Sequence, residues 1–123
     1  MSDVREVSPA KALEMIRKGA LLVDVREPFE IAGKSLDVPE TLLIPLRDID
    51  KRYREIPKGR QVIVCCRTGS RSVIATRILM KHGYNKAFNM QSGVIRWESE
   101  GLPVKGKPKQ KFGSWLLKIF SRK

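Results

Sequence analysis

Short apolar runs alternate along this chain with segments that have a helical spacing of apolar residues. Three short runs are mostly apolar, as expected of strands buried on both faces of a sheet; they span residues 20–25, 41–45 and 61–66. Residues 86–90 could form a fourth, short strand. The intervening segments 8–19, 46–57 and 72–83 repeat their apolar residues every three or four positions, which is typical of amphipathic helices. Strands that alternate with helices in this way predict an α/β fold, with a parallel sheet and helices on both of its faces.

The ends of two predicted helices carry clear signals. Ser8 is a candidate N-cap with Pro9 at the first helical position, and Gly19 can end this helix after two basic residues. Gly83 ends the segment 72–83 in the same way. In parallel sheets, functional sites lie in the loops beyond the carboxyl ends of the strands, and one such loop follows the run 61–66.

Both cysteines of the chain, Cys65 and Cys66, stand at the end of that run. If the strand ends at Cys65 and the next helix begins near Ser72, residues 66–71 form the whole connection. Such a loop directs backbone N–H groups and the positive end of a helix toward one point, and Arg67 and Arg71 add formal charge. A thiol at Cys66 would then have a pKa of roughly 3.5–7.5, as activated cysteines do.

Gly69 adds the backbone freedom that close approach to a ligand requires. The loop therefore predicts an anion or a thiolate at Cys66. The side chain of Cys65 points to the opposite face of the strand, and we interpret it as a small buried hydrophobic residue. The single histidine, His82, stands at the far end of the helix 72–83, about 15 Å away, and is expected on the surface. Metal-ligand spacing is absent, and we expect no metal and no cofactor.

Several motifs together resemble a known family. They are "LLVDVREPFE" at 21–30, "VIVCCRTGSRS" at 62–72, "HGY" at 82–84 and "SGVIRW" at 92–97. In this combination the chain resembles a single-domain rhodanese, a thiosulfate sulfurtransferase-like protein, over residues 4 to about 103. The resemblance implies a small parallel five-stranded sheet flanked by helices, with residues 1–103 as the rhodanese-like domain.

The resemblance also implies a mechanism. The Cys66 thiolate would attack a sulfane sulfur, as in thiosulfate, and keep it as a persulfide until a thiol or a protein acceptor removes it. Backbone N–H groups of residues 67–71 would hold the persulfide. Arg67 and Arg71 would attract a small anionic sulfur donor.

Other residues would support this chemistry. Thr68 and Ser70 would offer hydroxyl hydrogen bonds. Asp24 and Arg26 end a neighbouring strand, and we interpret them as a structural ion pair that braces the site. Ser92-Gly93 departs from the Gly-Gly that the family often has before its final aromatic residue, and the segment 32–45 also departs from the family pattern.

Two alternatives remain for the function. Phosphatases and arsenate reductases of related fold place Arg six positions after the cysteine, whereas position 72 is Ser here and the Arg stands at 71. This shorter loop favours a single sulfur atom over a phosphate. The second alternative is a sulfur carrier or docking module that holds a persulfide without turnover.

The charge of the chain is concentrated at its C-terminal end. The formal net charge is +12, and residues 104–123 contain seven Lys or Arg and no acidic residue, which leaves +5 for residues 1–103. This distribution argues against a nucleic-acid partner. An N-terminus without an apolar signal segment and two adjacent thiols predict a cytoplasmic protein.

The segment 104–123 is predicted to be a basic linker followed by an amphipathic helix. Residues 104–111 have linker composition. Beyond them, apolar residues including Phe112 and Trp115 share one face of a helical wheel, beside a basic stripe. Residues 111–123 could contact a membrane surface peripherally, pack back on the domain or bind a partner protein.

Overall fold

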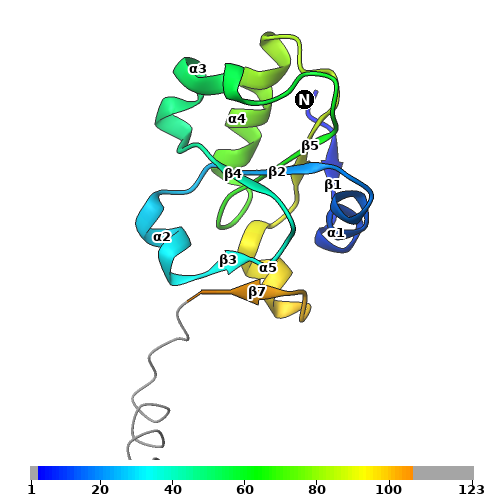
Figure 1. Ribbon diagram of the computed structural model, residues 1–123, viewed down its shortest axis with the longest axis vertical. Coiled ribbons are helices and arrows are strands. Elements are labelled where there is room, and N and C mark those ends of the chain that lie inside the picture. Colours follow the sequence, from blue (N-terminus) through cyan, green and yellow to red (C-terminus); the bar gives the residue numbers. More distant parts are fainter. Residues whose placement is uncertain (1–2, 107–123) are drawn as a thin grey trace, which may run out of the picture.

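The computed structural model of the protein describes residues 3–106 and contains a parallel five-stranded sheet (Figure 1). The strands follow the order β1-β6-β5-β2-β4, and each neighbouring pair is parallel. Their bounds are β1 Glu6–Val7, β2 Leu21–Asp24, β4 Thr41–Leu43, β5 Val62–Cys65 and β6 Ala87–Met90. The predicted α/β fold and its five parallel strands are confirmed. The four predicted strand segments supply four of the strands, and the two-residue β1 was not predicted by its own pattern.

Helices cover both faces of this sheet (Figure 1). The α-helices are α1 Pro9–Arg17, α2 Pro28–Gly33, α3 Ile49–Arg52, α4 Ser70–Lys81 and α5 Gly93–Ser99. Buried residues of α1 and α5 pack on one face, and those of α3 and α4 pack on the other. Ser8 caps α1 as predicted, because its hydroxyl accepts a hydrogen bond from the Lys11 N–H at 3.1 Å.

The predicted helix 46–57 is divided into three short pieces. The 3₁₀ turns η1 (Leu46–Asp48) and η2 (Tyr53–Glu55) flank α3. Asp48 N–H bonds to the Pro45 carbonyl, and Ile56 N–H bonds to the Tyr53 carbonyl. These bonds span three residues rather than four, so they tighten both ends of the segment. The apolar residues Ile49 and Ile56 of this segment are nevertheless buried, as its apolar spacing predicts.

The two cysteines belong to different halves of the core. Cys65 packs with Trp97 and the residues of α1 and α5, whereas Cys66 packs with Ala75, Leu79 and the other face. Successive side chains of a strand point to opposite sides, and the sheet therefore separates these two neighbours. Both cysteines are free and buried.

The end of the domain corrects one prediction. Val104 and Lys105 were placed in a linker, but they form the strand β7, which pairs antiparallel with β3 (Ser35–Leu36). The preceding residue Pro103 explains this, because its carbonyl accepts hydrogen bonds from the Trp97 indole at 2.8 Å and from the Asp37 N–H at 2.9 Å. Two residues are too few to show a strand pattern in the sequence.

Residues 107–123 lie outside the described residues, and the predicted amphipathic helix and its predicted membrane contact lie there with them. Within residues 3–106, no helix has the length and apolar character needed to cross a membrane.

The start of α5 holds the loop that follows β5. The N–H of Val94 donates to the Cys66 carbonyl at 2.9 Å, and the N–H of Ile95 donates to the Arg67 carbonyl at 3.1 Å. Gly93 has a φ of +58°, and a Cβ atom placed on it would lie 2.4 Å from both of these carbonyl oxygens. Glycine is therefore required for two reasons, its left-handed backbone and the close approach of the loop.

We predict that Gly93→Ala lowers the free energy of unfolding by about 2–4 kcal/mol, because it combines an unfavourable φ with a steric overlap against backbone atoms. Urea denaturation followed by circular dichroism measures this change. Gly33→Ala is the matched control, since a Cβ at Gly33 meets nothing within 4 Å. Equal stability of the two variants would show that α5 does not constrain the loop.

Candidate active site

The loop after β5 is shorter than predicted. The helix α4 begins at Ser70 rather than near Ser72, so only residues 66–69 connect it to the strand. Gly69 makes this possible with a φ of +104° at the N-cap position. A Cβ there would also lie 3.0 Å from the Ser92 backbone nitrogen. Ser70 and Arg71 consequently belong to the first turn of the helix.

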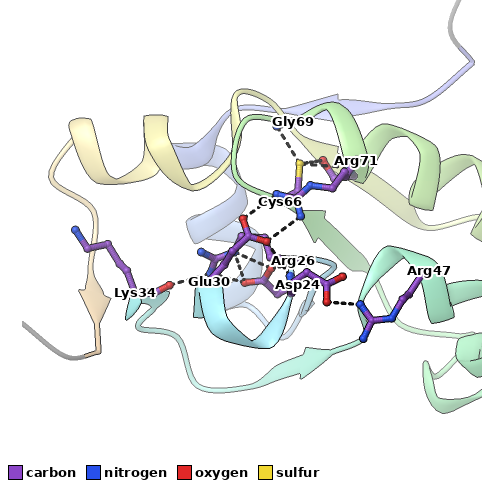
Figure 2. Close-up of polar contacts among 10 residues, drawn as sticks. Asp24, Arg26, Glu30, Lys34, Arg47, Cys66, Gly69 and Arg71 are labelled. Atoms are coloured by element: carbon purple, nitrogen blue, oxygen red, sulfur yellow. Dashed lines mark hydrogen bonds and ion pairs between the residues drawn. The ribbon is translucent and has the colours of Figure 1, made fainter. Parts of the chain in front are cut away.

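The sulfur of Cys66 lies within the turn that the loop and the helix form (Figure 2). The Gly69 N–H donates to Cys66 Sγ at 3.1 Å, and the Ser72 N–H approaches it at 3.4 Å. The Ser72 hydroxyl oxygen also lies 3.4 Å from Sγ. Two N–H groups and a hydroxyl thus converge on one sulfur atom, and when the sulfur is a thiolate the hydroxyl donates to it as well.

These contacts change the acidity of the thiol. Burial raises the pKa of the Cys66 thiol, but hydrogen bonds from the Ser72 hydroxyl and from the N–H groups of Ser72, Gly69 and Thr68 lower it by more. The net pKa is lowered from the ordinary thiol value, which favours a thiolate. Cys65 behaves in the opposite way, because its burial and the nearby Asp24 carboxylate raise its pKa well above the ordinary value.

The residues of the loop divide into buried and exposed members. Cys66 has no exposed surface, and Gly69 and Ser72 are also buried. Arg67, Thr68 and Ser70 are exposed. The Thr68 N–H helps to lower the pKa of the Cys66 thiol. The hydroxyl that contacts Sγ is that of Ser72, whereas the sequence predicted hydroxyl hydrogen bonds from Thr68 and Ser70.

Arg71 is engaged by an acidic residue of α2. Its Nη1 and Nη2 donate to the two carboxylate oxygens of Glu30 at 2.8 and 2.9 Å (Figure 2). The hydrogen bond from Arg71 lowers the pKa of Glu30 to about 2, despite its partial burial. The sequence predicted that Arg71 would attract an anionic sulfur donor. In the structure its guanidinium is bound to the Glu30 carboxylate.

Asp24 and Arg26 form the ion pair that the sequence predicted. Arg26 Nη2 lies 2.8 Å from Asp24 Oδ2, and the two side chains are almost fully buried. A further bond from Arg26 Nη2 to the Lys34 carbonyl, at 3.0 Å, ties the end of β2 to the end of α2. Burial lowers the pKa of Arg26, but the Asp24 carboxylate raises it by more, and the guanidinium remains charged.

His82 lies at the far end of α4 and takes no part in this site. Its ring stacks on Tyr53 with 3.7 Å between centroids, and its Nε2 is 3.0 Å from Asp50 Oδ1. It is partly buried by these contacts rather than simply exposed. Among residues 3–106, no group of three or more His, Cys, Asp or Glu side chains is arranged to hold a metal ion.

The sequence is similar to those of known proteins of one family. The model of the rhodanese-like domain matches residues 8–100. A sulfurtransferase of Allochromatium vinosum is 44% identical over 84 residues, which cover 68% of this chain and 77% of that protein. A putative sulfur carrier protein of Bacillus subtilis, YrkF, is 32% identical over 76 residues, which cover 62% of this chain and 40% of that protein.

A solved structure of a rhodanese-related protein has a similar fold. The crystal structure of a rhodanese-related protein from Thermoplasma volcanium superposes with a TM-score of 0.77 at 28% identity, covering 84% of this chain and 99% of that one. Together these similarities support a role in sulfur transfer, as a sulfurtransferase or as a sulfur carrier. The chain belongs to the family of rhodanese-like domains.

Proposed function

We propose that this protein moves a sulfane sulfur from thiosulfate or a persulfide donor to a thiophilic acceptor through a persulfide on Cys66. The observation that carries the proposal is the convergence of the Gly69 N–H, the Ser72 N–H and the Ser72 hydroxyl on Cys66 Sγ. Such donors stabilise a thiolate before the reaction and a negatively charged persulfide after it.

The reaction balances in two displacements. The Cys66 thiolate attacks the outer sulfur of thiosulfate, the sulfur–sulfur bond breaks, and sulfite leaves with the bonding electrons. The outer sulfur of the resulting persulfide is then attacked by a second nucleophile, which is a small thiol, cyanide or the cysteine of an acceptor protein. The Cys66 thiolate is the leaving group of this step and returns to its hydrogen bonds.

The position of Ser72 supports sulfur over phosphate. In the related phosphatases an arginine stands at the sixth position after the cysteine. Here that position holds Ser72, whose hydroxyl and N–H both lie 3.4 Å from the sulfur. The preceding Arg71 is bound to Glu30. The contacts of Ser72 thus surround one sulfur atom, and the neighbouring Arg71 is paired with Glu30 rather than free to bind a phosphate.

The complete burial of Cys66 favours a second candidate, the sulfur carrier. A thiol without exposed surface reacts only when surrounding atoms move, which slows encounters with small donors in solution. The similarity to a putative sulfur carrier of Bacillus subtilis points in the same direction. In both functions the persulfide on Cys66 is the same chemical state, and the two differ in the rate at which free small molecules load and unload it.

We predict that thiosulfate adds one sulfur atom to the wild-type chain and to Cys65→Ala, but not to Cys66→Ala. The mass of the intact protein, with peptide mapping of the 61–71 region, measures this addition. Cys65→Ala is the matched control, because it removes a buried thiol from the same strand end. Addition to Cys66→Ala would contradict the proposal.

Steady-state assays separate the enzyme from the carrier. A sulfurtransferase that uses free donors should turn over thiosulfate and cyanide continuously, and Cys66→Ala should abolish this turnover. A carrier should load stably and release its sulfur at a near-zero rate to cyanide, but quickly to a protein acceptor. Failure to load from thiosulfate and from an organic persulfide would contradict both functions.

We predict that Ser72→Ala slows alkylation of Cys66 by iodoacetamide at neutral pH by about threefold to tenfold. The Ser72 hydroxyl lowers the pKa of the thiol, so its loss raises the pKa and reduces the thiolate fraction below that pKa. At alkaline pH the thiolate is complete in both proteins and the rates should converge. Ser70→Ala, an exposed serine of the same helix turn, should leave the profile unchanged. Identical profiles for Ser72→Ala and wild type would refute the role of the hydroxyl.

A further inference from the structure

Four charged side chains beside the cysteine loop form two ion pairs, and the formal charges within each pair cancel. Asp24 pairs with Arg26, and Glu30 pairs with Arg71 (Figure 2). Arg71 is also close enough to Cys66 for the thiolate charge to stabilise its guanidinium. Arg71 is therefore a cation whose guanidinium interacts with the charge on the sulfur, and its own charge is already balanced by Glu30.

The carboxylate of Glu30 is fixed in its position by its own helix. Glu30 Oε1 accepts a hydrogen bond from the Glu27 N–H at 2.8 Å, as the third residue of a capping box does. The same carboxylate bonds both terminal nitrogens of Arg71. A bidentate contact of this kind holds a guanidinium in one orientation. The side chain of Glu30 is only 17% exposed, so solvent screens this pair less than it screens a surface pair.

The remaining cation of the loop, Arg67, lies in a different setting. Its residue is exposed, and its carbonyl is bound to the start of α5. An exposed guanidinium in water attracts anions weakly. A dianion such as thiosulfate would thus approach a negative thiolate without a strong compensating charge. A donor with a smaller negative charge would meet less repulsion.

We propose that Glu30 is a specificity-determining residue which, by neutralising Arg71, selects against dianionic donors and favours a persulfide carried on an organic thiol. The choice of donor rests on the proposed function. The electrostatic role of Glu30 does not depend on it, because any reagent that reaches Cys66 experiences the same charges.

Two alkylating reagents of nearly equal size test this role without any sulfur transfer. Iodoacetate is an anion and iodoacetamide is neutral, and both react with the Cys66 thiolate by displacement of iodide. The ratio of their rates reports the local potential, whereas changes in thiolate fraction or access affect both reagents. Mass mapping assigns the reaction to Cys66 rather than to Cys65.

Glu30→Gln should raise the iodoacetate-to-iodoacetamide ratio by about threefold to tenfold at low salt, because no carboxylate then balances the charge of Arg71. Glutamine preserves the capping box, since its side-chain oxygen can still accept from the Glu27 N–H. Arg71→Gln should lower the ratio, because it leaves the Glu30 carboxylate unbalanced. The double variant should return close to wild type, and all differences should shrink at high salt.

Glu40→Gln is the matched control. Glu40 pairs with Arg60 at 2.6 Å. The two residues precede β4 and β5, so the pair lies at the N-terminal ends of the strands, whereas the cysteine loop lies at their C-terminal ends. Like Glu30→Gln, the Glu40→Gln variant removes one negative charge from a carboxylate that is bound to an arginine. It should leave the iodoacetate-to-iodoacetamide ratio of Cys66 unchanged. A ratio that stays the same in both Glu30→Gln and Arg71→Gln, or that moves equally in Glu40→Gln, would overturn the electrostatic role.

The donor preference is measured by the rate of sulfur loading on Cys66. Glu30→Gln should accelerate loading from thiosulfate about threefold to tenfold, relative to wild type. Loading from the persulfide of 2-mercaptoethanol, which carries at most one negative charge, should change less. Equal changes for both donors would overturn the selectivity. If no donor loads any of the proteins, the proposed function fails, and the assignment of a donor fails with it. The alkylation ratios would still decide the electrostatic role in that case.

Discussion

Two hydrogen bonds from the start of α5 decide which way the cysteine loop faces. They bind the carbonyls of Cys66 and Arg67, at 2.9 and 3.1 Å. In a planar trans peptide the carbonyl and the following N–H point in opposite directions. Because the carbonyls of Cys66 and Arg67 point toward α5, the N–H groups of the next residues, Arg67 and Thr68, point away from it. The Thr68 N–H is one of the groups that lower the pKa of the Cys66 thiol. Gly93 lets α5 come close enough to bind the two carbonyls.

The difference between the two cysteines follows from the same geometry. Cys65 is the last residue of β5, and its side chain enters the core between the sheet and α1 and α5. Burial and Asp24 keep it a neutral thiol. One residue later the chain has left the strand, and Cys66 faces the start of α4, where hydrogen bonds outweigh burial. A single step along the backbone thus separates a thiol whose pKa is raised from one whose pKa is lowered.

Much of this structure could be predicted from local patterns, but the contacts that tune the site could not. The buried strands β2 and β5 and the helices α1 and α4 have sequence periodicity and clear end signals, and the parallel-sheet rule places the site at the end of β5. By contrast, Glu30 and Arg71 are 41 positions apart, and nothing local indicates that they meet. The strands β3 and β7 contain two residues each and depend on tertiary hydrogen bonds. Ser72 carries a local signal, a hydroxyl near the start of a helix after a cysteine, but neither loop length nor the helix start predicts its contact with the sulfur.

The account depends most on the claim that backbone and hydroxyl donors keep Cys66 as a thiolate while Cys65 remains protonated. A spectrophotometric pH titration of thiolate absorbance, in wild type, Cys65→Ala and Cys66→Ala, tests it directly. The account predicts one thiolate that forms below the ordinary pKa of a thiol, that persists in Cys65→Ala and that is lost in Cys66→Ala. An early titration that survives in Cys66→Ala, or a Cys66 thiol that ionises only at or above the ordinary value, would contradict it.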